Sequence, residues 1–129
     1  MTPRLRILVV DDDEMIRDTY ALFLEDRWDL VMKASPEEAF SFIETGHAVD
    51  AVITDFDFKC SFDGTHVATV VRRKYPHIPI IMATGSVLES PRIQAFHAIP
   101  NTKLLRKPFL HTVLDEILSA EASSLGGGH

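Results

Sequence analysis

Short apolar runs alternate along this chain with longer segments in which apolar residues recur every three or four positions. The apolar runs are five in number and occupy residues 5–10, 29–34, 51–54, 79–83 and 103–106. They show little alternation of apolar and polar residues, which is typical of strands buried on both faces of a parallel sheet. We therefore predict five short parallel strands, of which the last is the least hydrophobic.

The segments that follow these runs have the pattern of amphipathic helices. Helices are predicted over residues 15–25, 36–45, 65–75, 91–98 and 110–120. Ser35 and Glu38 form a capping box, and Gly46 ends the helix that this box begins. A strand followed by a helix, five times over, predicts an α/β fold: a doubly wound, five-stranded parallel sheet with helices on both faces.

The composition is that of one globular domain. The chain has 129 residues, of which 46% are hydrophobic and 25% charged. Its formal net charge of −6 argues against direct nucleic-acid binding. No apolar stretch approaches the ~20 residues of a membrane span, and the single cysteine, Cys60, fits a cytoplasmic location. We assign residues 1–120 to the folded domain and the Gly/Ser-rich residues 121–129 to a flexible tail.

Polar side chains with complementary chemistry follow four of the predicted strands. Ligands of such sheets bind at the carboxyl ends of the strands, so these side chains are candidates for one site. They are Asp11, Asp12, Asp55, Asp57, Thr84 and Lys107. Carboxylates about 4 Å apart repel by roughly 4 kcal/mol per pair at an effective dielectric near 20. The cluster therefore predicts a hard cation, Mg²⁺ with Mn²⁺ as the alternative, and the whole set suits phosphoryl transfer. Asp13 and Glu14 are interpreted as helix N-terminal acids.

With these residues in this order, the chain resembles the receiver domain of two-component response regulators, which has a flavodoxin-like (βα)5 fold. The resemblance covers residues 4–120 and rests on five motifs in order. They are ILVVDD at 7–12, AVITD at 51–55, DG at 63–64, IIMATG at 80–85 and KPF at 107–109. Each motif alone is weak, but the ordered set is specific.

The resemblance implies that Asp55 accepts a phosphoryl group from a histidine kinase or a phosphotransfer protein. It implies that Asp12 binds Mg²⁺ directly and that Asp11 contributes directly or through water. Asp55 and the backbone carbonyl of Asp57 would complete the metal site. The protein would then be a signalling module rather than an enzyme, with at most self-phosphorylation and autodephosphorylation activity.

The resemblance also implies how phosphorylation is detected. Thr84 would donate a hydrogen bond to a phosphoryl oxygen, Lys107 would pair with the phosphoryl group, and the peptide bond before Pro108 would be cis. Output to an unknown protein target, and a homodimer if one forms, would use the face of the fourth helix, fifth strand and fifth helix.

Three features depart from the family pattern. The loop after the acceptor, residues 58–62, lacks the usual Met-Pro pair and is one residue longer. Asp57 adds a negative charge near the acceptor, and we expect it to alter the lifetime of the phosphoryl group. Leu104 replaces the aromatic residue three positions before the lysine, so rotation of an aromatic ring is not available as the signal.

Two other interpretations remain open at this stage. Asp55 and Asp57 also match the first motif of haloacid-dehalogenase-type phosphohydrolases, although that motif normally follows the first strand of a longer chain. Alternatively, the altered loop and Leu104 would suit a degenerate receiver that only binds a partner. Turnover of an aryl phosphate would favour the first alternative, and failure to bind a phosphoryl mimic would favour the second.

Overall fold

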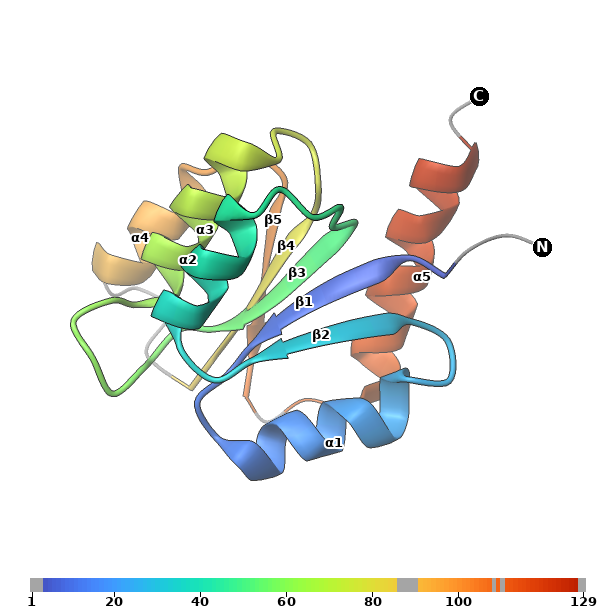
Figure 1. Cartoon of the computed structure of the whole chain (residues 1–129), viewed down its shortest axis with the longest axis horizontal. Helices are drawn as coiled ribbons and strands as arrows, with labels where there is room; N and C mark the ends of the chain where they lie inside the picture. The colour runs from blue at the N-terminus through green and yellow to red at the C-terminus, as the bar shows by residue number, and fades with distance from the viewer. Residues whose placement is uncertain (1–3, 86–90, 108, 110, 128–129) are drawn as a thin grey trace.

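The computed structural model describes residues 4–85, 91–107, 109 and 111–127. Strands and helices alternate along the chain, as Figure 1 shows. In order they are β1 (Arg6–Val10), α1 (Glu14–Leu24), β2 (Asp29–Lys33), α2 (Pro36–Glu44), β3 (Ala51–Asp55), α3 (Gly64–Lys74), β4 (Ile80–Thr84), α4 (Pro91–His97), β5 (Thr102–Arg106) and α5 (His111–Gly127). The predicted alternation of strand and helix is confirmed.

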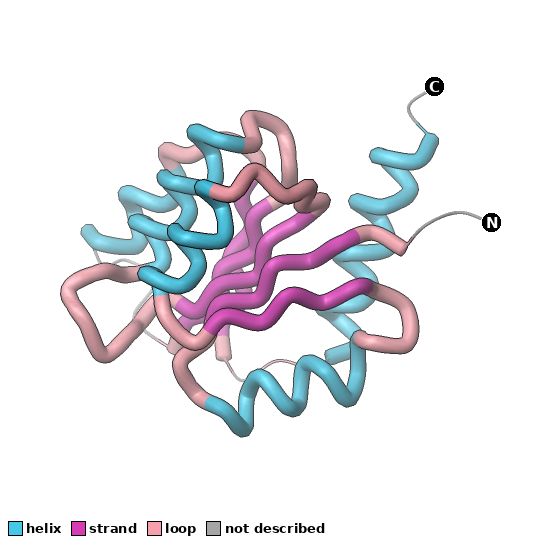
Figure 2. The backbone as a smooth tube through the Cα atoms, in the orientation of Figure 1, coloured by secondary structure: helices cyan, strands magenta, loops and turns pink. Residues whose placement is uncertain are grey.

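The five strands form one parallel sheet in the order β2-β1-β3-β4-β5. The chain turns from β1 to the edge strand β2 and then returns to β3 on the other side of β1. Helices α1 and α5 cover one face of the sheet, and α2, α3 and α4 cover the other (Figures 1 and 2). This arrangement is the doubly wound fold that the sequence predicted, and it places the switch in strand order between β1 and β3.

The core lies in two layers, one on each face of the sheet. Alternate residues of β1 serve the two layers because successive side chains of a strand point to opposite faces. Leu8 packs with α2, α3 and α4, whereas Val9 packs with α1 and α5. All five residues of β3 and of β4 are buried, but β5 is an edge strand and is only partly buried. This explains why its sequence is the least hydrophobic.

The helices begin where the sequence provides capping residues. Asp13 accepts hydrogen bonds from the backbone N–H groups of Met15 and Ile16, at 2.9 and 3.3 Å, so its interpretation as a helix N-terminal acid is confirmed. Ser35 caps α2 through the N–H of Glu38, at 3.1 Å. The predicted strand and helix boundaries are met to within one or two residues except at the end of α5.

Helix α5 runs to Gly127, through most of the segment that was predicted to be a flexible tail. Each added residue of a helix gains a hydrogen bond once the helix has started. Here Glu121 also pairs with Lys103 of β5, at 3.7 Å.

A second difference concerns Phe23: its spacing from Ile16, Tyr20 and Leu24 in the sequence predicts a place on one apolar face of α1. It is 55% exposed and stacks on the His111 ring, with centroids 4.3 Å apart. Tyr20 and Leu24, four positions apart, face the core.

Candidate functional site

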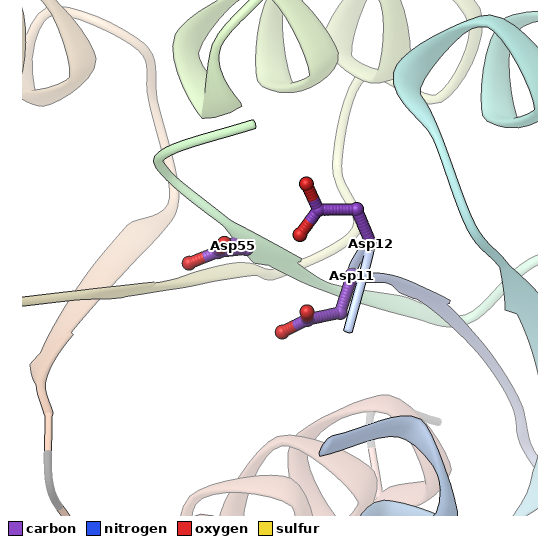
Figure 3. A group of neighbouring side chains, drawn as sticks. All are labelled: Asp11, Asp12 and Asp55. Carbon is purple, nitrogen blue, oxygen red and sulfur yellow. The ribbon is translucent and has the colours of Figure 1, made fainter. Parts of the chain in front are cut away.

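Three carboxylates from two neighbouring strands meet at the carboxyl edge of the sheet. Asp11 and Asp12 follow β1, and Asp55 is the last residue of β3. One oxygen of each carboxylate lies within 4.8 Å of the others. Figure 3 shows the three side chains on the same side of the strand ends. The sequence predicted this convergence because parallel strands end at a common edge.

Lys107 supplies the positive charge of the site. Its Nζ donates a hydrogen bond to Asp55 Oδ1 at 2.8 Å. Burial lowers the pKa of Lys107, but the hydrogen bond and the charge of Asp55 outweigh burial, and the pKa is raised. Burial raises the pKa of Asp55, and Lys107 opposes this rise. The lysine therefore stays protonated and holds the Asp55 carboxylate at the strand end.

Asp11 is the most deeply buried of the three acids, at 2% exposed. Its Oδ1 accepts the N–H of Asp13 at 2.9 Å, whereas its Oδ2 is buried and has no hydrogen-bond partner among the described residues. Burial, with the charges of Asp55 and Asp12, raises the pKa of Asp11 to about 6, although the Asp13 N–H and Lys107 oppose the rise.

An unsatisfied, buried carboxylate oxygen within an all-oxygen cluster is the donor set that Mg²⁺ or Mn²⁺ prefers. The residues present therefore fit the metal that the sequence predicted. A divalent cation would remove the mutual repulsion of the carboxylates and give Asp11 Oδ2 a partner.

The remaining predicted site residues lie around this cluster. Thr84 ends β4 and is fully buried, and its carbonyl accepts the backbone N–H of Lys107 at 2.7 Å. The carboxylate of Asp57 is exposed, and its charge contributes to the raised pKa of Lys107. Pro108 and its predicted cis peptide bond lie outside the described residues.

Close backbone packing also shapes the site, and the sequence analysis did not identify it. A Cβ atom on Gly64 would lie 2.5 Å from the Asp55 carbonyl oxygen and 2.9 Å from Phe56 Cα. Only glycine allows the first turn of α3 to approach the end of β3 this closely. Arg17 Nη1 also donates to the Asp11 carbonyl at 2.8 Å. The Asp63-Gly64 pair was the available signal, but the backbone contact behind it could not be deduced from residue type.

Comparison with known families shows to which family this fold and site belong. A family model described as the response regulator receiver domain matches residues 7–119. The chain belongs to this receiver-domain family. Receiver domains are signalling modules in two-component systems and are generally not enzymes. They bind Mg²⁺ at an acidic pocket and interact with histidine kinases or phosphotransfer proteins and with downstream targets.

Individual relatives agree with this assignment. Over 84 residues the receiver domain is 33% identical to an NtrX-like response regulator of Rickettsia typhi, covering 64% of this chain and 18% of the relative. Over 90 residues it is 30% identical to the heme response regulator HssR of Staphylococcus saprophyticus, covering 69% of this chain and 39% of the relative. The chain thus spans less than half the length of either relative.

Solved structures of response regulator receiver proteins have the same fold as this chain. A response regulator receiver protein of Sinorhizobium medicae superposes with a TM-score of 0.81 at 28% identity, covering 92% of this chain and 94% of that one. The chemotaxis protein CheY4 of Vibrio cholerae superposes with a TM-score of 0.79 at 27% identity, covering 92% and 98%. Within the described part of the receiver domain, no helix is both long and apolar enough to cross a membrane.

The position that the resemblance assigns to an aromatic residue is occupied by a half-buried leucine in this receiver domain. Leu104 pairs with Met82 across β4 and β5 and packs against the layer covered by α2, α3 and α4. No large ring is available here to change between buried and exposed positions.

Proposed function

We propose that Asp55 is the phospho-acceptor of this receiver domain. The observation that carries the proposal is the position of its carboxylate, which is held by Lys107 at 2.8 Å and lies within the cluster formed with Asp11 and Asp12. A nucleophile, a fixed cation and a cation-binding set of acids are the components that phosphoryl transfer requires.

In the proposed reaction, a carboxylate oxygen of Asp55 attacks the phosphorus of a phosphohistidine. A new P–O bond forms, which makes an acyl phosphate, and the P–N bond breaks. The electron pair of the broken bond stays on the imidazole nitrogen of the donor, which then takes up a proton. The charge of Lys107 stabilises the negative charge on the transferring phosphoryl oxygens.

Asp11, Asp12 and Asp55 would hold Mg²⁺, with the Asp57 backbone carbonyl as a further ligand. The bound cation supplies positive charge at the phosphoryl oxygens and allows acids that repel one another to remain ionised. The unsatisfied Asp11 Oδ2 supports this assignment.

Phosphorylation would shift a two-state equilibrium through Thr84 and Lys107. The Thr84 hydroxyl would donate to a phosphoryl oxygen, and Lys107 would transfer its hydrogen bond from Asp55 to the phosphoryl group. The output surface would be formed by α4, β5 and α5. A downstream target, or a second copy of the domain, would bind there.

The phosphohistidine donor would dock beside α1. Three side chains of α1 are unusually exposed for apolar residues: Met15 at 78%, Leu22 at 73% and Phe23 at 55%. A neighbouring groove of about 210 Å³ is lined by Ile16, Thr19, Tyr20, Lys107, Phe109 and His111. Because Lys107 both lines the groove and binds Asp55, a protein docked there would present its histidine close to the acceptor.

The proposal is tested by intact-mass measurement after incubation with acetyl phosphate and Mg²⁺. We expect one phosphoryl adduct on the wild type and on Asp57→Asn, and none on Asp55→Asn or in the presence of EDTA. No adduct on the wild type, together with no binding of beryllofluoride, would favour a degenerate receiver. Turnover of an aryl phosphate would instead favour a phosphohydrolase.

A further inference from the structure

The loop that joins β3 to α3 contacts the acidic cluster on one side and helix α2 on the other. Its two ends are fixed: Phe56 is buried and Asp63 caps α3. Between them, most of residues 57–62 are exposed, and this segment projects from the edge of the sheet (Figure 1). On the side of α2, Phe62 packs edge-on against Phe40, with centroids 5.3 Å apart. This contact holds the C-terminal end of the loop against α2.

On its other side, the loop contacts the acidic cluster through a backbone group. The Lys59 N–H donates a hydrogen bond to Asp12 Oδ2 at 3.2 Å. This contact requires a residue other than proline at position 59, because proline carries no N–H. Asp12 is only half-buried, in contrast to the buried Asp11, which is fixed by the Asp13 N–H. The Lys59 amide supplies the corresponding restraint on Asp12.

We infer that the Lys59 backbone amide positions Asp12 for cation binding and thereby makes the β3–α3 loop responsive to occupancy of the metal site. The inference rests on the proposed metal site and deepens it. Groups that hydrogen-bond a ligating carboxylate fix its orientation, and losing such a group costs about tenfold or more in metal affinity. The free energy of a hydrogen bond to a charged acceptor corresponds to a similar change in affinity.

The coupling acts in both directions. If the amide strengthens cation binding by a given factor, cation binding strengthens the amide contact by the same factor. A bound cation would therefore restrict the motion of residues 57–62. This segment includes Phe62, whose ring contacts Phe40 of α2. Occupancy of the metal site could thus affect α2 without an aromatic residue at position 104, which is leucine in this domain.

The first test compares the Mg²⁺ affinity of the wild type, Lys59→Pro and Lys59→Ala by calorimetry. Both variants lose the side-chain charge, but only Lys59→Pro loses the N–H. We expect Lys59→Pro to bind Mg²⁺ about tenfold more weakly than Lys59→Ala. Equal affinity of the two variants would overturn the inference while leaving the metal site intact, whereas absence of Mg²⁺ binding by the wild type would overturn the metal site itself.

The second test uses the wild type alone and so does not depend on how the loop tolerates proline. Hydrogen exchange of the Lys59 amide is followed by NMR with and without saturating Mg²⁺. We expect about tenfold slower exchange with Mg²⁺, as the reciprocal of the affinity effect. Unchanged or faster exchange would show that the cation does not strengthen the contact and would contradict the inference.

Discussion

Replacing Asp11 by Asn isolates the cost of the buried, unsatisfied carboxylate. In the absence of metal, the pKa of Asp11 is raised from 3.8 to about 6, chiefly by burial. Between these two pH values, the folded protein binds a proton that the unfolded chain has released. Raising the pH through this window therefore lowers the free energy of unfolding of the wild type, and the loss persists at neutral pH.

The size of the effect follows from the pKa difference. The gap between 3.8 and about 6, at 1.36 kcal/mol per pH unit, corresponds to about 3 kcal/mol at pH 7. Asn retains an oxygen that can accept the Asp13 N–H but carries no charge, so Asp11→Asn should recover part of this energy. Because a buried amide also needs partners, we expect a gain of about 1–3 kcal/mol at pH 7.

The assay is urea unfolding with EDTA at several pH values between 4 and 7. Asp18→Asn serves as the control, because it makes the same chemical change at an exposed position of α1. The stabilisation of Asp11→Asn should be near zero at pH 4 and should grow towards pH 7. A difference that is constant with pH, or a variant less stable than the wild type at pH 7, would refute the reasoning. Saturating Mg²⁺ should stabilise the wild type more than the variant.

Three further substitutions test other parts of the structure. Gly64→Ala places a Cβ against the Asp55 and Phe56 backbone, so it should lower the free energy of unfolding by about 1–3 kcal/mol and slow phosphorylation. Urea unfolding should show no such loss for Gly85→Ala, because a Cβ at position 85 would meet open space. Arg72→Ala removes hydrogen bonds to four backbone carbonyls that join the α3–β4 and α4–β5 connections, and should cost about 2–4 kcal/mol by the same assay. Phe23→Ala should slow phosphoryl transfer from phosphorylated histidine kinases about tenfold but leave phosphorylation by acetyl phosphate unchanged. Equal effects on both donors would contradict docking at α1.

Much of the fold could be predicted because its determinants are local in sequence. Uninterrupted apolar runs marked the buried strands, and Asp13 and Ser35 marked the starts of two helices. The convergence of Asp55 and Lys107 followed from topology alone, since residues after parallel strands share one edge of the sheet. Side-chain chemistry and strand order together were therefore enough to predict the acidic site.

The remaining features depend on backbone groups or on tertiary contacts, which cannot be deduced from residue type alone. The approach of Gly64 to Asp55 and the Lys59 N–H donated to Asp12 are of this kind. Phe23 fits a buried helical face by periodicity, but it lies at the edge of that face and stacks on His111 instead. These contacts arise only once distant segments are brought together.

The most direct test of the central claim is to locate the phosphoryl group. The protein is phosphorylated with acetyl phosphate and Mg²⁺ and then treated with borohydride, which reduces an aspartyl phosphate to homoserine. Peptide sequencing by mass spectrometry identifies the position that has changed. We predict homoserine at position 55 and nowhere else, with none in samples treated with EDTA. Homoserine at position 57, or a phosphoryl group on any other residue, would contradict the assignment of Asp55.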